Sequence, residues 1–498
     1  MTAGRGGLYQ NIIARIKNAG DKTFITGSSG DYLYSDIDPI CAKIQNVMTG
    51  VGVKKGSRVL VQVEKSPEAV MLYLACLRMG AIFVPLNTGY TSGEVSYFFE
   101  NSEPDLCVVS PDKQESFKDI VGEKPVLTLS SNKDGSLWQQ CSDANAEIAE
   151  LTSDDIAAIL YTSGTTGRSK GAMLSNENLR SNAEVLSEYW QWSEDDVLLH
   201  VLPIFHVHGL FVALHCALWT TNTMIFHNGL NVENIIADLA RSTVFMGVPT
   251  HYVRLLDNPT FNADVCRNMR LFLSGSAPLL TETFIQFEER SGLKILERYG
   301  MTEAGMITSN PYNGERVAGT VGFPLPGVSG RIGAEKDGKG VLEIKGANVF
   351  KGYWRMPEKT KEEFTDDGFF ITGDISTMDA DGRFTIVGRA KDLIITGGFN
   401  VYPKEIESLI DDIDGVKESA VIGVAHPDFG EGVTAIVILD DTKNMTEADI
   451  DNLICDSLAK FKLPKKIYII DALPRNTMGK VQKNALRETY ADIYRKLK

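Results

Sequence analysis

The chain has 498 residues, a length that predicts about three domain-sized units, although large α/β enzymes often merge two of them. Hydrophobic residues make up 43% and charged residues 23%, which is typical of a globular protein and excludes a disordered or collagen-like chain. Sixty-five acidic against 50 basic residues give a net charge of −15. This charge opposes non-specific binding to nucleic acid or to an anionic membrane.

The seven cysteines show no CxxC or similar clustering, so we expect neither a disulfide framework nor a zinc site, and a reducing compartment fits. No run of about eighteen apolar residues occurs, and residues 1–20 lack the apolar segment of a secretory signal. These features predict a cytoplasmic protein that does not enter a membrane.

The first element with a clear signal is a helix that begins after Ser66 and ends at Gly80. Pro67 stands at the first helical position, and Gly80 is a typical C-terminal stop. Its apolar stripe at helical spacing consists of Val70, Met71, Leu74 and Leu77. The apolar run 81–84 that follows predicts a buried strand.

The same alternation continues along the chain, with predicted strands at 156–161, 197–202, 243–248 and 271–273, and a helix between the first two of these. Strands alternating with helices predict an α/β fold of mostly parallel, helix-covered sheets. After about residue 390, strands are predicted at 420–424, 433–439 and 467–470, with helices near 447–461 and 485–497. We therefore expect a large domain over 1–389 and a small α+β domain over 390–498.

The strongest chemical signal is the run Tyr161-Thr-Ser-Gly-Thr-Thr-Gly-Arg-Ser-Lys-Gly171, which follows a predicted strand and precedes a predicted helix. Glycines allow backbone N–H groups to approach an anion, while hydroxyls and Lys170 add donors and charge. The run does not fit the Walker A pattern. A flexible turn is the alternative, but it would need neither Lys170 nor the apolar strand. The expected phosphate-binding residues are Thr162, Ser163, Gly164, Thr165, Thr166, Gly167 and Lys170.

This run resembles the signature of the adenylate-forming superfamily, which includes acyl-CoA synthetases, peptide-synthetase adenylation domains and luciferases. Other segments agree in the expected order: Ser274-Gly-Ser-Ala-Pro278, Tyr299-Gly-Met-Thr-Glu303, Thr372-Gly-Asp374, Gly388-Arg389 and Gly479-Lys480. Segments 348–360 and 474–484 carry a narrower likeness to malonyl-CoA synthetases. The resemblance implies two steps: a carboxylate attacks the α-phosphate of Mg·ATP to form acyl-AMP and pyrophosphate, and the thiol of CoA then displaces AMP.

The resemblance also implies roles for individual residues around the nucleotide. Glu303 matches the Mg²⁺ ligand, Thr302 a hydroxyl that contacts phosphate, and Asp374 the acceptor for the ribose hydroxyls. Taken alone, Thr302 and Glu303 could be a helix N-terminus, and Asp374 a turn residue. The remaining expected nucleotide contacts are Gly275, Ser276, Ala277, Pro278, Tyr299, Gly300, Met301 and Arg389. An ordinary loop after a strand would explain residues 275–278 equally well.

By the same likeness, Lys480 enters the site for adenylation and leaves when the small domain rotates about Lys391. Gly397, Gly398 and Phe399 would then line the pantetheine tunnel of CoA. A surface lysine is the alternative reading of Lys480, and only the motif argues against it. An accessible charged lysine of this kind is also a candidate for silencing by a lysine acyltransferase.

The run 202–210 matches the segment beside the acyl carboxylate. It supplies His206, Val207 and His208, and His206 is a candidate for catalysis as well as for substrate binding. The expected pocket is completed by Ser276, Arg254 and Met306. Arg298 directly precedes the Tyr299–Glu303 motif. A buried cation needs an anionic partner, and a guanidinium fits a carboxylate bidentately, so Arg298 favours a short diacid such as malonate. The alternative is an arginine paired with a protein acid such as Glu297.

One residue departs from the family pattern: Val207 stands where relatives can have Thr, so the preference between malonate and methylmalonate stays open. Three functions compete: a malonyl-CoA synthetase, another adenylate-forming ligase, and a nucleotide-binding scaffold without catalysis. Arg298 argues against an apolar acyl chain, and the pair Glu303 and Lys480 argues against a scaffold. The oligomeric state cannot be predicted from these patterns.

Overall fold

The computed structural model describes residues 6–27, 30–142, 146–162, 169–336, 338–396, 399–440, 445–455, 457–458, 460–476 and 479–494. Packing divides the chain into two compact units. The first unit comprises 1–329 with 344–370, and the second comprises 330–343 with 371–498. The expected boundary at 389/390 was placed where the pattern of predicted strands and helices changes, and it stays a prediction. No helix in the described ranges has the length and apolar character needed to cross a membrane.

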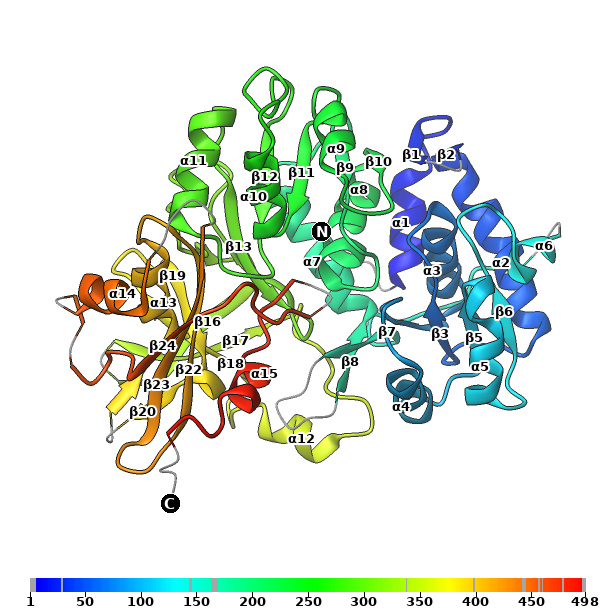
Figure 1. Cartoon of the computed structure of the whole chain (residues 1–498). Coiled ribbons are helices and arrows are strands. Elements are labelled where there is room, and N and C mark those ends of the chain that lie inside the picture. The colour runs from blue at the N-terminus through cyan, green and yellow to red at the C-terminus, as the bar shows by residue number, and fades with distance from the viewer. Residues whose placement is uncertain are drawn as a thin grey trace. The chain divides into compact units, whose positions relative to one another are not determined.

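Two sheets form the first unit, and both are mainly parallel (Figure 1). The nine-stranded sheet has the order β15 (Phe323–Pro324), β14 (Gly305–Ser309), β13 (Leu296–Met301), β12 (Leu271–Ser274), β11 (Val244–Gly247), β9 (Val197–His200), β10 (Thr223–Phe226), β1 (Thr23–Gly27) and β2 (Gly30–Leu33). The six-stranded sheet has the order β6 (Val126–Thr128), β5 (Leu106–Val109), β3 (Arg58–Gln62), β4 (Ile82–Pro85), β7 (Ile156–Thr162) and β8 (Lys170–Ser175). Antiparallel pairs occur only toward their edges.

Helices connect these strands and cover the sheets. They are α1 (Leu8–Ile16), α2 (Ile37–Gly50), α3 (Pro67–Met79), α4 (Ser92–Ser102), α5 (Gln114–Val121), α6 (Ser136–Gln139), α7 (Asn176–Tyr189), α8 (Leu214–Thr220), α9 (Val232–Leu239), α10 (Pro249–Asp257), α11 (Thr281–Ser291) and α12 (Pro357–Glu362), with short 3₁₀ turns η1 (Tyr34–Asp36) and η2 (Pro111–Lys113) and a π-helix, η3 (His208–Ala213). The predicted α/β class with mostly parallel sheets is confirmed.

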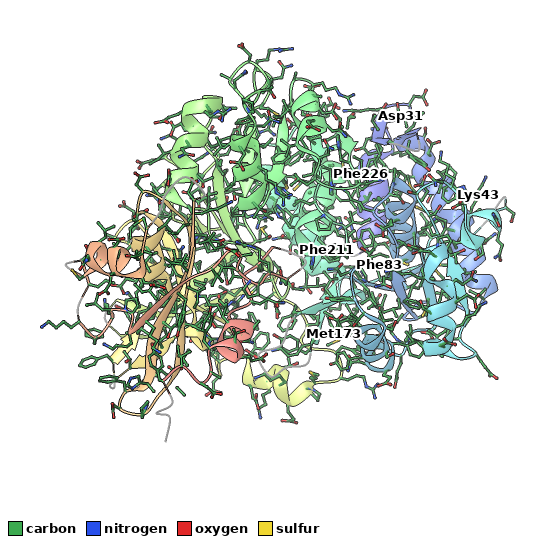
Figure 2. The ribbon with its side chains drawn as sticks, viewed as in Figure 1. Asp31, Lys43, Phe83, Met173, Phe211 and Phe226 are labelled. Atoms are coloured by element: carbon green, nitrogen blue, oxygen red, sulfur yellow. The ribbon has the colours of Figure 1, made fainter. Side chains whose placement is uncertain are left out.

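Helix α3 shows how local signals set an element and how packing completes it. The Ser66 hydroxyl accepts a hydrogen bond from Ala69 N at 3.1 Å, and Gly80 ends the helix at φ +73°. Both are predicted caps. Every residue of α3 is buried, so the helix packs on all sides rather than along one stripe. On it, the Tyr73 ring contacts Phe83 of β4 at 5.1 Å and Phe211 of η3 at 5.8 Å; Figure 2 labels both phenylalanines.

The phosphate-loop run does not lead into a helix as expected. It connects β7 to the antiparallel strand β8, and α7 begins only at Asn176. The apolar run 171–174 pairs with β7 and with the segment around Tyr353, which is why it forms a strand. Lys170, an expected phosphate-binding residue, is therefore the first residue of a strand.

The second unit contains a sheet of β16 (Val328–Lys336), β17 (Lys339–Gly346), β18 (Phe370–Met378) and β19 (Phe384–Arg389). A further five-stranded sheet has β21 (Phe399–Val401), β20 (Ile394–Thr396), β23 (Gly430–Leu439) and β22 (Val416–His426) in order, with β24 (Lys466–Ile469) pairing β23. Its helical elements are η4 (Ala390–Asp392), α13 (Pro403–Asp411), α14 (Glu447–Ile454) and α15 (Lys483–Thr489).

The predicted strands of the small domain are confirmed, whereas both predicted helix ends are wrong. Helix α14 ends at Ile454, and α15 ends at Thr489. Ile450, Ile454 and Leu458 keep a four-residue spacing, and all three pack in the same core, although only the first two are helical. Apolar spacing thus continues beyond the point where the backbone leaves the helix.

Candidate active site

Arg298 lies in the middle of β13, and only 3% of its surface is exposed. Its Nε and Nη2 atoms are buried and have no hydrogen-bond partner among the described residues. Burial lowers the pKa of Arg298 to about 10, an effect that the Tyr252 phenol partly opposes. The side chain is therefore charged near pH 7 and has donors free to bind an anion.

The adjacent acid, Glu297, does not pair with Arg298. Successive residues of a strand point to opposite faces, and Glu297 accepts a hydrogen bond from Gly319 N at 2.9 Å. Burial raises the pKa of Glu297 to about 8, so this carboxyl is mainly neutral at pH 7. The alternative in which Glu297 neutralises Arg298 is therefore wrong.

His208 lies within electrostatic reach of Arg298 and of three further histidines, His251, His200 and His206. His208 begins η3 and is 4% exposed; its pKa is held well below 6.5 by burial, and next by Arg298, His251, His200 and His206. Burial likewise lowers the pKa of His251 to about 4 and that of His200 well below its ordinary value. Besides burial, the side chains that lower these three pKa values are basic. We call Arg298 and these four histidines the basic cluster.

The loop after β12 places Gly275 and Ser276 against the basic cluster. A Cβ atom on Gly275 would lie 2.2 Å from Arg298 Nη1, so glycine is required for this close approach. Ser276 has a positive φ of 71°, and its Oγ lies 3.4 Å from His208 Nδ1. The two residues that follow, Ala277 and Pro278, are exposed. Their expected place beside adenine stays a prediction.

Val207 and Met306, the residues expected near the substrate α-carbon, are both buried. Met306 pairs with Gly300 across the β13–β14 hairpin, where a Cβ on Gly300 would come within 2.4 Å of Met306 Cε. Asn182 of α7 fixes the Met306 backbone: its Nδ2 donates to Met306 O at 3.0 Å, and its Oδ1 accepts from Met306 N at 3.1 Å. The position of Met306 is thus set by backbone contacts rather than by its own flexible side chain.

Two further basic residues, Arg254 and Lys65, differ from the sequence prediction for the pocket. Arg254 is exposed on α10 and acts on His251 by further lowering its pKa. His251, which stands three positions before Arg254, was not among the residues expected in the pocket. Lys65 was missed altogether: it is 7% exposed, donates from Nζ to His200 O at 2.9 Å, and also lowers the pKa of His200 and His251. No local pattern marks a lysine before a helix cap as buried.

Thr302 and Glu303 lie in the turn that joins β13 to β14, so the alternative of a helix N-terminus is wrong. Glu303 is 6% exposed and accepts a hydrogen bond at Oε1 from the Tyr353 hydroxyl at 2.9 Å. In the described part of the chain, no group of three or more His, Cys, Asp or Glu could hold a metal ion. A Mg²⁺ ion at Glu303 would thus take one protein carboxylate with phosphate and water oxygens, and this donor set fits the ion. Tyr299 and Met301 precede this turn, with Tyr299 Oη 3.9 Å from Met301 Sδ.

Lys170 is the described end of the phosphate-loop run; the expected contacts Ser163, Gly164, Thr165, Thr166 and Gly167 lie outside the described residues. Thr162, on the other side, donates to Lys170 O at 3.4 Å. Lys170 is 8% exposed, its Nζ lies 3.3 Å from Glu363 Oε1 and 4.1 Å from the centroid of the Tyr353 ring. Tyr353 therefore contacts both Lys170 and Glu303.

Asp374 lies within β18 of the second unit, not in a turn, so that alternative is wrong. It is 3% exposed and is paired in register with Arg389 of β19, whose Nε lies 2.7 Å from Asp374 Oδ1. The sequence named both as nucleotide contacts, and the structure brings them together. Their roles toward ribose stay predictions.

Lys480 lies in a tight loop of the second unit. Its backbone N donates to Asn476 Oδ1 at 2.9 Å, Gly479 before it has φ +74°, and its side chain is exposed. Lys391 is an exposed residue of η4. Phe399 is 55% exposed and stacks on Phe461 at 4.6 Å, whereas Gly397 and Gly398 lie outside the described residues.

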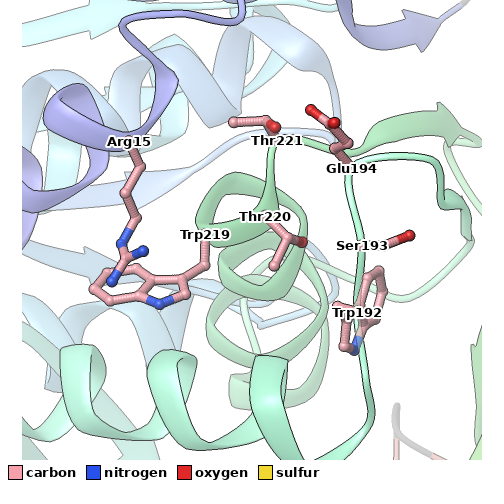
Figure 3. Close-up of a pocket in the computed structure, with 7 residues that line it drawn as sticks. All are labelled: Arg15, Trp192, Ser193, Glu194, Trp219, Thr220 and Thr221. Atoms are coloured by element: carbon pink, nitrogen blue, oxygen red, sulfur yellow. The ribbon is translucent and has the colours of Figure 1, made fainter.

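A separate hollow of about 430 Å³ lies at the α8 end of the first unit (Figure 3). In it, Arg15 of α1 stacks over the Trp219 ring at 3.8 Å, beside Trp192 and Thr220. It contains none of the residues that the sequence analysis selected.

The family described as AMP-binding enzyme matches residues 13–354, and the family of its C-terminal domain matches residues 405–480. The chain belongs to the AMP-binding enzyme family. It is 34% identical to the malonate–CoA ligase of Arabidopsis thaliana, over 97% of this chain and 88% of that protein. It is 33% identical to the mitochondrial malonate–CoA ligase ACSF3 of Mus musculus, over 95% of this chain and 90% of that protein. The structure resembles ATP-bound MatB from Rhodopseudomonas palustris, with a TM-score of 0.96 and 49% identity over 99% of this chain and 100% of the other.

Proposed function

We propose that this protein is a malonyl-CoA synthetase, which joins malonate to CoA through malonyl-AMP and converts ATP to AMP and pyrophosphate. Its relatives named as malonate–CoA ligases span most of the chain, and the ATP-bound neighbour supports the use of ATP. Among AMP-binding enzymes, the acid that is activated depends on the acyl pocket. The choice of malonate therefore has to be argued from residues.

The single observation that carries this choice is the buried, unpaired guanidinium of Arg298. A buried charge without a partner is destabilising, and a bound carboxylate would offset that penalty. The two free donors, Nε and Nη2, match the two oxygens of a carboxylate. A short diacid can present one carboxylate to Arg298 and the other to the reacting phosphate. A monocarboxylic acid would leave the guanidinium unpaired.

In the first step, a malonate oxygen attacks the α-phosphorus, and the bond to pyrophosphate breaks. Negative charge grows on the phosphate oxygens, so donors and cations lower the barrier. On this proposal Lys170, Thr302 and residues 163–167 bind phosphates, and Lys480 contributes its charge during this step. His206 and neutral His208 orient the acyl carboxylate. Mg²⁺, held by Glu303, would supply charge neutralisation at the phosphates.

In the second step, the CoA thiolate attacks the acyl carbon, and AMP leaves. We propose that Asp374 accepts hydrogen bonds from the ribose hydroxyls, with Arg389 holding its carboxylate in place. Phe399 would contact the pantetheine arm, and Lys391 would be the hinge between the two steps. A cytoplasmic location, acylation of Lys480 and the oligomeric state stay predictions or open questions.

A panel of acids tests the substrate directly. Pyrophosphate release would be measured with acetate, propionate, malonate, methylmalonate, succinate and octanoate. Malonate should give the highest kcat/KM, with methylmalonate the nearest competitor, because a single added methyl group changes specificity by only about 1–3 kcal/mol. A preference for acetate or octanoate would disprove the malonate assignment and leave another adenylate-forming ligase. Absence of pyrophosphate release with every acid would favour a nucleotide-binding protein without catalysis.

A further inference from the structure

The segment 350–354 connects two parts of the candidate active site. On one side it pairs with β8: Lys351 N donates to Met173 O at 3.0 Å, and Met173 N donates to Gly352 O at 2.9 Å. On the other side, Phe350 N donates to Glu303 O at 2.7 Å. The strand that follows the phosphate loop and the turn that carries the candidate metal ligand are thus held by the same short stretch of backbone.

The Tyr353 side chain makes a second connection between the same two parts. It is 3% exposed; its hydroxyl donates to Glu303 Oε1 at 2.9 Å, and Lys170 Nζ lies 4.1 Å from its ring centroid. The ring is itself held in place. Tyr353 N donates to Thr360 Oγ1 at 2.9 Å, and the Phe350 ring packs edge-on against it at 4.9 Å.

We propose that Tyr353 is a positioning residue for the adenylation step, because it orients the metal-binding carboxylate of Glu303 and holds the Lys170 ammonium beside it. A hydrogen bond to one oxygen of a ligating carboxylate fixes the direction of the other oxygen. A desolvated cation over an aromatic face gains electrostatic attraction. One rigid side chain therefore sets the spacing of the two charges that the phosphates meet. This inference rests on the proposed role of Glu303.

The hydroxyl is tested by Tyr353→Phe, which keeps the ring. Binding of α,β-methylene-ATP, an analogue that cannot be cleaved at the α-phosphate, would be measured by calorimetry across Mg²⁺ concentrations. The Mg²⁺ concentration that gives half of the maximal gain in affinity should rise by about 10-fold or more. Affinity without Mg²⁺ should not change. An unchanged Mg²⁺ dependence would overturn the proposal.

A matched control is Tyr32→Phe. The Tyr32 hydroxyl also donates to a buried carboxylate, that of Glu68, and neither residue belongs to the candidate active site. This variant should keep the Mg²⁺ dependence of the original protein. If both variants shift it equally, the effect reflects a general loss of a buried hydrogen bond, and the positioning role is rejected.

The ring is tested by Tyr353→Leu. Relative to Tyr353→Phe, it should weaken binding of the analogue without Mg²⁺, because Lys170 loses the aromatic face and keeps its ion pair with Glu363. Equal affinities in the two variants would reject the ring's part in the proposal. Should the leucine variant fail to fold, the same comparison can be made with Tyr353→Met, which likewise removes both the aromatic face and the hydroxyl.

Glu303→Gln separates this inference from the proposed function. If the glutamine variant loses the Mg²⁺ dependence while Tyr353→Phe leaves it intact, only the inference about Tyr353 is wrong. If Glu303→Gln itself responds to Mg²⁺ like the original protein, the metal role of Glu303 is wrong, and the inference about its hydroxyl partner is overturned with it.

Discussion

The guanidinium of Arg298 lies directly against Gly275, with no room for a side chain between them: a Cβ at position 275 would be 2.2 Å from Nη1 and 2.5 Å from Cζ. Gly275 directly follows β12, and Arg298 lies in β13, the neighbouring strand of the same sheet. A glycine in the motif that resembles an adenine-binding loop therefore also sets the position of Arg298, the proposed cation of the acyl pocket.

Gly275→Ala should displace the Arg298 guanidinium. We expect kcat/KM for malonate to fall by about 100-fold, the effect of moving a binding group by roughly 1 Å. Steady-state kinetics with malonate and ATP varied separately would measure it, and KM for ATP should change much less. Gly50→Ala, where an added Cβ meets nothing within 4 Å, is the control. A loss confined to ATP would show that Gly275 serves only the nucleotide.

Arg298→Met should remove malonate activity and yet stabilise the protein. The substitution replaces an unpaired buried charge by an apolar side chain of similar length, a change worth about 1–4 kcal/mol in favourable cases. Thermal unfolding should show a higher Tm for the variant. Malonate should raise the Tm of the original protein and not that of the variant. A lower Tm together with a retained response to malonate would contradict the assigned role of Arg298.

Glu297→Gln should change how stability depends on pH. Because the folded-state pKa of Glu297 is about 8, above its ordinary 4.5, the folded protein binds more protons between these values. The stabilising contribution is complete below pH 4.5 and decreases as pH rises toward 8, by up to about 1.4 kcal/mol per pH unit. The variant keeps an acceptor for Gly319 N and should lose this slope. Denaturation midpoints at several pH values, compared with those of the exposed-site control Glu289→Gln, would measure the difference; parallel curves would show that Glu297 is ionised.

Lys480→Ala should abolish formation of malonyl-AMP and leave the attack of CoA on supplied malonyl-AMP largely intact. Its side chain is exposed, so stability should hardly change. Pyrophosphate release measures the first half-reaction, and malonyl-CoA formation measures the second. Lys417→Ala, at another exposed lysine of the second unit, is the control. Equal losses in both half-reactions would reject the division of labour.

Local signals predicted much of the fold. The caps Ser66 and Gly80 fixed the ends of α3, because each acts through its own backbone neighbours. The missed strand β8 depends on distant partners: Met173 bonds to Gly352, far along the chain. The ends of α14 and α15 were wrong because apolar spacing reports burial and does not mark where helical hydrogen bonds stop.

The candidate site shows the same limit. Motifs identified Arg298, Glu303 and Asp374, since their neighbours in sequence carry the family pattern. The sequence did not reveal contacts between remote segments. Tyr353 contacts Glu303, fifty positions away, and Lys65 contacts His200, 135 positions away. The pairing of Asp374 with Arg389 follows from the register of β18 and β19, and that register cannot be predicted from a single sequence.

The basic side chains that lower the pKa values of His200, His208 and His251 have a consequence for how substrate arrives. With a net charge of −15, the protein repels a dianion at long range, whereas the basic cluster attracts it at short range. Dissolved salt weakens the repulsion beyond about 8–10 Å and scarcely reaches a buried contact. Moderate ionic strength should therefore speed the capture of a doubly charged acid, which is the reverse of electrostatic steering. The protein then distinguishes one acid from another after the encounter rather than during the approach.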